Sequence, residues 1–207
     1  MPKKYDRAYF DKWYRRSASR VSTQAEVRRK VAMAIATAEY FLRRPLHSVL
    51  DVGCGEAPWL LHLRALRPRV RYLGLDPSDY VIERFGVERN IRKAAFGELG
   101  KIDLDGPFDL VVCADVLHYL PDAEIRPGAE AIARIAGGIA FLELLTAEDD
   151  IVGDLEGLIR RPAAWYRALF TAAGLTAIGP YCWLSPALRS TVAELEILEN
   201  GTRRRRR

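Results

Sequence analysis

The stretch that most constrains the fold is "SVLDVGCGEAPW", in which an apolar run meets two glycines and a proline. The run Ser48–Val52 predicts a buried strand, and Pro58 is typical of the first turn of a helix. Between them, Gly53 and Gly55 permit positive φ and a close backbone approach to a ligand. A strand, a tight turn and a helix predict one unit of an α/β sheet, whose turn either binds a nucleotide or only connects the two elements.

The alternation of strand-like and helix-like segments continues along the chain, without an internal repeat or a long linker. This order predicts a Rossmann-like, doubly wound, mostly parallel sheet with an antiparallel last strand. We expect helices over residues 23–43, 58–66, 78–85, 122–135 (interrupted at Pro127–Gly128) and 162–173. The expected strands are Ser48–Val52, Arg71–Leu75, Ile91–Phe96, Phe108–Cys113, Gly138–Leu144, Leu175–Trp183 and Thr191–Leu198.

Three segments differ in composition. We expect a helical N-terminal extension at residues 1–44, one domain at 45–200 and a basic, disordered tail at 201–207. Thr23 and Glu26 have the spacing of a capping box at the start of the long helix of the extension. Five aromatic residues lie among basic ones near the start of the chain: Tyr5, Tyr9, Phe10, Trp13 and Tyr14.

The net charge of +5 comes from the five arginines Arg203–Arg207, because the other 27 basic residues are balanced by 27 acidic ones. The basic pI is therefore no evidence for a nucleic-acid-binding surface. No apolar run is long enough to span a membrane, and the first residues do not have the pattern of a secretory signal. The chain has three cysteines, and no two of them have C-x-x-C spacing, so neither a set of disulfides nor a cysteine zinc site is expected. Unpaired cysteines are typical of a reducing compartment, so we expect a cytoplasmic protein.

Two aspartates flank the glycine turn in the expected fold. Asp76 ends the second strand, where a carboxylate can accept hydrogen bonds from a ribose diol or cap the helix that begins near Ser78. Asp51 lies two residues before Gly53, where it can anchor the turn or meet a cationic group of a ligand. Pro58 occupies the third glycine position of G-x-G-x-x-G, so the turn departs from the dinucleotide fingerprint.

Three segments, "LDVGCGEAPW", "YLGLDPS" and "FDLVVCADVLHYLP", together resemble successive motifs of the class I S-adenosylmethionine-dependent methyltransferases of the small-molecule type. Their order and spacing match from about residue 45 to 145. The resemblance implies a seven-stranded sheet, S-adenosylmethionine as cofactor, a small-molecule acceptor of the methyl group, and N-terminal helices that form a lid over the cofactor. The N-terminal aromatics could equally pack as an amphipathic helix on the sheet.

The resemblance also implies the residues that contact the cofactor. The implied contacts are Asp51, Gly53, Cys54 and Gly55 at the amino acid part, Asp76, Pro77 and Ser78 at the ribose, Glu98 at the adenine, and Cys113 and Ala114 beside the methyl group. Phe96 is an alternative to Glu98 as the residue near the adenine.

Candidates for acceptor chemistry follow the fourth expected strand. His118 can serve as a base, because an imidazole titrates near neutral pH, or it can bridge loops. Asp115 can orient the acceptor or cap a helix. The acid-rich loop at residues 146–157 favours an amine-bearing substrate over a metal site, so we expect no metal. The residues predicted to contact the substrate are Tyr9, Tyr14, Tyr119 and Glu143.

Other functions remain open at this point. A nucleic-acid-modifying methyltransferase could be recruited by the basic termini, although "CADV" follows the fourth strand where amino-methylating DNA enzymes carry an N-P-P-Y-like segment. A cofactor-binding protein without catalysis is a further alternative, and a nicotinamide-dependent oxidoreductase fits the turn less well. The acceptor atom and the oligomeric state cannot be derived from the sequence.

Overall fold

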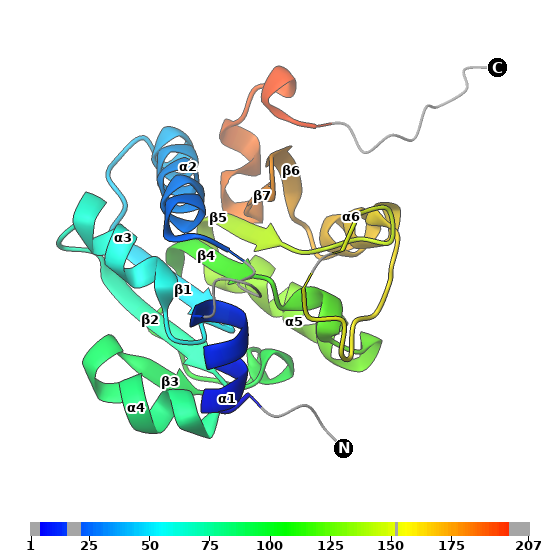
Figure 1. The fold of residues 1–207 in the computed structure, drawn as a ribbon. Helices are drawn as coiled ribbons and strands as arrows, with labels where there is room; N and C mark the ends of the chain where they lie inside the picture. Colours follow the sequence, from blue (N-terminus) through cyan, green and yellow to red (C-terminus); the bar gives the residue numbers. More distant parts are fainter. Residues whose placement is uncertain (1–4, 16–21, 152, 199–207) are drawn as a thin grey trace.

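A seven-stranded sheet forms the centre of the computed structural model, which describes residues 5–15, 22–151 and 153–198 (Figure 1). The strand order is β3-β2-β1-β4-β5-β7-β6. β1 to β5 pair in parallel, and β7 lies antiparallel between β5 and β6, which confirms the expected fold class. The strands are β1 (Ser48–Val52), β2 (Arg71–Asp76), β3 (Ile91–Lys93), β4 (Phe108–Ala114), β5 (Ala136–Glu143), β6 (Thr176–Gly179) and β7 (Cys182–Leu184).

Helices cover both faces of this sheet. Because strand side chains alternate between faces, Val49 packs in one apolar core with α2, α3 and α4, whereas Leu50 packs in the other with α5 and α6. Burial of apolar side chains in these two cores is the main contribution to the stability of such a fold. The helices are α1 (Arg7–Phe10), a π-helical turn (Asp11–Arg15), α2 (Gln24–Leu42), α3 (Pro58–Leu66), α4 (Asp79–Arg89), α5 (Asp122–Ile135) and α6 (Ala163–Ala172).

The start of α2 confirms the predicted capping box. The Thr23 hydroxyl accepts a hydrogen bond from the Glu26 N–H (3.2 Å), and the Glu26 carboxylate accepts one from the Thr23 N–H (2.6 Å). The helix ends at Leu42, followed by Arg43 in the left-handed conformation (φ 54°). Both ends of α2 are thus fixed by local sequence, which holds its buried face against the sheet.

The predicted interruption at Pro127–Gly128 is wrong, since α5 runs without a break from Asp122 to Ile135. A proline removes one backbone hydrogen bond, which full burial of Ile125 and Ile132 against the sheet outweighs. Gly128 has a packing role, because a Cβ there would lie 1.9 Å from the ring of Phe96.

The end of the described chain differs most from expectation. The predicted strand Leu175–Trp183 is a hairpin of β6 and β7, turned at Pro180 and at Tyr181 (φ 56°). The predicted strand Thr191–Leu198 is wrong: Pro186–Thr191 and Glu194–Glu196 form 3-10 turns. Leu195 is fully exposed there, so the alternating pattern does not mark a buried face.

Two sequence-based expectations concern the ends of the chain and its location. The basic tail at residues 201–207 lies outside the described residues. Among the residues that are described, no helix is both long enough and apolar enough to cross a membrane. The division into a domain at 45–200 with an extension at 1–44, and the cytoplasmic location, stay predictions.

Candidate functional site

The glycine turn after β1 is tied to the end of β2. The N–H groups of Gly53 and Cys54 both donate to the carbonyl of Leu75, at 2.7 and 3.1 Å. Gly53 (φ 70°) and Gly55 (φ 52°) adopt the left-handed conformation, and a Cβ on Gly53 would lie 2.5 Å from Val116 Cγ2. Glycine is therefore required at this position for both its conformation and its size.

Asp76, at the end of β2, holds the turn in place. Its two oxygens accept hydrogen bonds from the N–H groups of Gly55 (2.8 Å) and Ser78 (2.9 Å). Burial raises the pKa of this carboxyl, and the two backbone hydrogen bonds lower it by less. The helix cap of α4 is instead Ser78, whose hydroxyl accepts from the Val81 N–H. The alternative reading of Asp76 as the cap of that helix is therefore not what the structure shows.

Asp51, at the middle of the sheet, is buried and accepts a hydrogen bond from the Tyr72 hydroxyl (2.9 Å). Desolvation by burial raises the pKa of this carboxyl to about 7, and the nearby Asp76 carboxylate adds to the shift. Asp51 lines neither of the two cavities described below.

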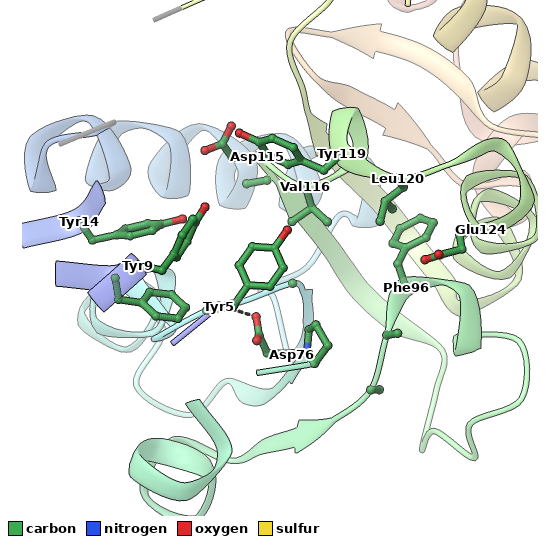
Figure 2. Close-up of a pocket in the computed structure, with 17 residues that line it drawn as sticks. Tyr5, Tyr9, Tyr14, Asp76, Phe96, Asp115, Val116, Tyr119, Leu120 and Glu124 are labelled. Atoms are coloured by element: carbon green, nitrogen blue, oxygen red, sulfur yellow. Dashed lines mark hydrogen bonds between the residues drawn. The ribbon is translucent and has the colours of Figure 1, made fainter. Parts of the chain in front are cut away.

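The first cavity, of about 230 Å³, lies at the carboxyl ends of β1, β2 and β4 (Figure 2). Figure 2 shows Asp76 at one side of it, Phe96 and Glu124 at another, and Asp115 and Tyr119 at a third. The N-terminal segment supplies one wall, with Tyr5, Tyr9, Phe10 and Tyr14. The remaining lining residues are Gly53, Gly55, Pro77, Ala94, Ala95, Ala114, Val116 and Leu120.

The N-terminal wall is attached to α4. The Ser78 hydroxyl donates to the Tyr5 carbonyl, while the ring of Phe10 lies 5.6 Å from that of Tyr80. Figure 1 shows α1 next to the strand ends on that side. These contacts explain how residues remote in sequence come to enclose the glycine turn.

A second cavity, of about 200 Å³, shares a wall with the first. Two ligands, one bound in each cavity, would therefore contact each other at the end of β4. The shared residues are Tyr14, Gly53, Ala114, Asp115 and Tyr119. The second cavity adds Ser22, Val27, Lys30, Cys54, Pro58, Trp59, Glu143, Leu145 and Asp154.

Asp115 has an unusual backbone for a residue other than glycine, with φ 63°. Its N–H donates to the Glu143 carbonyl (3.0 Å), and its carboxylate lies 3.5 Å from His118 Nε2. The His118 ring is fully buried and its Nδ1 accepts from the Leu145 N–H (3.2 Å), so the neutral ring carries its hydrogen on Nε2. The left-handed conformation costs about 1–2 kcal/mol per residue, and such strain is often found at functional sites.

Three phenols surround the meeting point of the cavities. Burial and nearby carboxylates raise the pKa of Tyr9, Tyr14 and Tyr119, so each offers a protonated hydroxyl at neutral pH. The Tyr119 hydroxyl donates to the Asp154 carbonyl (2.8 Å). These side chains contribute hydrogen-bonding groups without adding charge.

The structure brings most of the predicted residues to the two cavities. His118 lines neither, and its role as a base stays a prediction. Glu98 is exposed and accepts from the Ala95 N–H (2.8 Å), while Phe96, the alternative to it, lines the first cavity. The predicted residues that do not line either cavity are Asp51, Ser78, Glu98, Cys113 and His118.

Sequence reasoning did not assign Lys30, Trp59 or Glu124 to the site. The signal for Lys30 is its place on α2, three residues after the buried Val27, at the edge of the helix face that meets the sheet. Within the described ranges, no group of three or more histidine, cysteine or acidic residues is placed to hold a metal ion.

A family model described as "Methyltransferase domain" matches residues 50–137, which include the glycine turn, Asp76 and Asp115. This part of the chain is therefore similar to a methyltransferase domain. A curated relative, trans-aconitate 2-methyltransferase from Deinococcus radiodurans, is 35% identical over 82 residues, which cover 38% of this chain and 30% of that protein. The chain thus matches less than a third of this relative's length.

Solved methyltransferase structures share the fold. Magnesium protoporphyrin IX methyltransferase from Synechocystis PCC 6803, with bound SAH, has a TM-score of 0.62 at 16% identity, covering 87% of this chain and 96% of that one. CalS10, an amino pentose methyltransferase from Micromonospora echinaspora with bound SAM, has a TM-score of 0.59 at 21% identity, covering 73% and 84%. These likenesses show that the chain shares the fold of methyltransferases solved with SAM or SAH bound.

Proposed function

We propose that the protein transfers a methyl group from S-adenosylmethionine to a small-molecule acceptor. The observation that carries the proposal is the wall common to both cavities, because methyl transfer requires a donor and an acceptor to meet at one place. The first cavity would hold the cofactor and the second the acceptor. The curated relative's name, trans-aconitate 2-methyltransferase, also supports an acceptor of small size.

The residues of the first cavity fit the parts of this cofactor. At Gly53 and Gly55 the turn lines the cavity without a side chain, which leaves room for the amino acid part of the cofactor. The Asp76 carboxylate accepts two backbone hydrogen bonds and has lone pairs left for ribose hydroxyls. Phe96 and Leu120 offer apolar surface for the adenine.

When bound, the cofactor supplies a methyl group already activated on a sulfonium. The chain then has to align the acceptor and exclude water. Tyr9 and Tyr14 would exclude water from the side of the N-terminal segment, while Asp115 and Tyr119 would orient the acceptor from the end of β4. Such a reaction needs no conspicuous catalytic residue.

Two other functions have less support. A nucleic-acid-modifying enzyme would depend on the basic tail, which lies outside the described residues. A cofactor-binding protein without catalysis would have no use for the second, polar cavity next to the first. The family and the curated relative favour neither of them.

Two measurements test the proposal. Isothermal titration calorimetry should show that S-adenosylhomocysteine binds the purified protein, with NAD as the control ligand; tighter binding of NAD would contradict the proposal. A metabolite extract incubated with the protein and a methyl-labelled donor should then yield a labelled small molecule, identified by mass spectrometry. Label found only in added RNA or DNA would favour the nucleic-acid alternative.

A further inference from the structure

The wall of the first cavity has a definite order of residues. The glycine turn lies next to Asp76, whose carboxylate accepts a hydrogen bond from the Gly55 N–H (2.8 Å). The Ala94 N–H donates to the Asp76 carbonyl (3.2 Å), so the segment after β3 begins beside that acid. This segment then lines the cavity as far as Phe96. The wall therefore runs from the glycine turn, past Asp76, to Phe96.

The end of the cavity beyond Asp76, here called the Phe96 end, is apolar except at one residue. Its described lining residues are Pro77, Ala94, Ala95, Phe96, Leu120 and Glu124. Among them, Glu124 is the one with a polar side chain. Figure 2 shows it on the side of the cavity away from Tyr9 and Tyr14. A ligand group bound at the Phe96 end thus meets the Glu124 carboxylate in otherwise apolar surroundings.

The Glu124 side chain is held against the turn that carries Phe96. It belongs to the first turn of α5, and a Cβ added at Gly97 would lie 3.2 Å from Glu124 Cγ. One helical turn later, Gly128 makes room for the ring of Phe96. Residues four apart share one face of a helix, so Glu124 and the Phe96 ring lie side by side (Figure 2).

Glu98, the acid that the resemblance implies at the adenine, does not line the cavity. Its side chain is exposed, and its carboxylate accepts a hydrogen bond from the Ala95 N–H (2.8 Å) at the start of the same 3-10 turn. The acid at the Phe96 end therefore comes from α5 and not from the segment after β3.

We propose that Glu124 binds the exocyclic amino group of the adenine and so makes the protein selective for an adenine-bearing donor; this inference rests on the proposed function. In the cofactor, the ribose lies between the sulfonium and the adenine. With the ribose at Asp76, the base would extend along Ala94 and Ala95 toward Phe96. The amino group lies on the edge of the adenine that points away from the ribose, which is the edge that would meet Glu124.

The carboxylate and the amino group have complementary hydrogen-bonding character. An ionised carboxylate only accepts hydrogen bonds, and the amino group of adenine donates them. Hypoxanthine has an oxygen at the same ring position and would place a second acceptor against the carboxylate. A site built around a donor rejects an analogue that lacks it, because the polar group of the site then loses its partner. Since Glu124 is only half-buried, we expect a preference of about tenfold.

The test uses three ligands that differ in one substituent of the purine. These are S-adenosylhomocysteine, its analogue with unsubstituted purine, and S-inosylhomocysteine, which carry an amino group, a hydrogen and an oxygen at that position. Each is titrated into the purified protein by calorimetry. S-adenosylhomocysteine should bind about tenfold more tightly than the purine analogue, with S-inosylhomocysteine weakest.

Two variants of Glu124 make the test specific. Glu124→Ala should weaken binding of S-adenosylhomocysteine about tenfold and leave that of the purine analogue unchanged, because only the former donates to the carboxylate. Glu124→Gln should bind S-inosylhomocysteine more tightly than the unaltered protein does, because an amide can also donate to the oxygen. A merely structural role of Glu124 would change the affinities for all three ligands by the same factor.

Two further variants serve as controls. Glu130→Gln changes an exposed glutamate of α5 that lines neither cavity, and Glu98→Gln keeps an oxygen to accept from the Ala95 N–H. Both should retain the preference for the amino group.

The inference is overturned by equal affinities of the unaltered protein for the three ligands. It is also overturned by an equal loss for all three in Glu124→Ala, or by a preference that Glu98→Gln removes and Glu124→Ala retains. Failure of S-adenosylhomocysteine to bind the unaltered protein would instead contradict the proposed function, so the two failures are distinguishable.

Discussion

Asp51 and Asp76 end up in different roles although they lie on neighbouring parallel strands, close to the same glycine turn. Both are buried, and burial raises the pKa of each carboxyl. Asp51 meets the Tyr72 hydroxyl inside the sheet and lines no cavity. Asp76 accepts hydrogen bonds from the backbone of Gly55 and Ser78 and also lines the first cavity.

The difference shows that burial of an acid near a ligand site does not by itself make it a ligand contact. Asp51 has one side-chain donor, and its desolvation is otherwise uncompensated. Asp76 has two backbone donors, which orient its oxygens while leaving lone pairs toward the cavity. We therefore expect changes at Asp51 to affect mainly stability and changes at Asp76 to affect mainly cofactor binding.

The largest expected effect is a pH dependence of stability due to Asp51. Its pKa of about 7 in the folded protein lies above the ordinary value, so the folded state binds an additional proton between about pH 4 and 7. The free energy of unfolding contributed by this group therefore falls as pH rises through that window. In urea unfolding, the free energy of unfolding of Asp51→Asn should rise relative to that of wild type by up to about 4 kcal/mol between pH 4 and 8. A pH-independent difference would contradict the shift.

The next effect concerns Asp76. Asp76→Ala removes the acceptor for two backbone N–H groups and, under the proposed function, for the ribose hydroxyls. The affinity for S-adenosylhomocysteine, measured by calorimetry, should therefore fall about 100-fold. Asp76→Asn retains one oxygen and should lose less. An unchanged affinity in Asp76→Ala would show that the carboxylate serves only the loop.

The glycine turn between the two acids provides a smaller effect with a matched control. Gly53→Ala combines φ 70° with a Cβ 2.5 Å from Val116 Cγ2, so the free energy of unfolding should fall by about 2–3 kcal/mol. Gly157 has a similar φ of 75° with nothing within 4 Å of its Cβ, so Gly157→Ala should cost only about 1 kcal/mol. Equal losses in chemical denaturation would show that conformation alone, and not contact with Val116, requires glycine at the turn.

The smallest expected effect is that of Tyr72→Phe. Removing the hydroxyl takes away the hydrogen bond that lowers the pKa of Asp51, so that pKa should rise further. The loss of stability at neutral pH should be about 1–2 kcal/mol. Tyr80→Phe is the control, because its hydroxyl bonds to Glu56 and not to Asp51. If the stability of both variants depends on pH in the same way, the Tyr72 hydroxyl does not affect the pKa of Asp51.

The sequence was most informative where local signals and burial agree. The run Ser48–Val52 is a buried strand as predicted, and Thr23 caps α2 as its spacing indicates. Asp76 ends a buried strand, and this position in the sequence predicts its place at the carboxyl edge of the sheet. In each case a few neighbouring residues determine the outcome.

The remainder depends on contacts distant in sequence. Residues 191–198 alternate like a strand, but β6 pairs with β7 instead, and only the Leu198 N–H donates to β6, at Ala177. Lys30 lies at the second cavity because α2 packs across the sheet near Glu143, with which Lys30 forms an ion pair. The local sequence around Lys30 does not predict this contact. The wall formed by Tyr5 depends likewise on Ser78, 73 residues away.

The shared wall of the two cavities has a kinetic consequence. Tyr14, Asp115 and Tyr119 border both spaces, so a substitution at any of them should change the KM for donor and acceptor together. Lys30 and Glu143 border only the second space, and changes there should alter the acceptor KM alone. Acceptor preference could therefore be redesigned through α2 and β5 while use of the donor stays as it is.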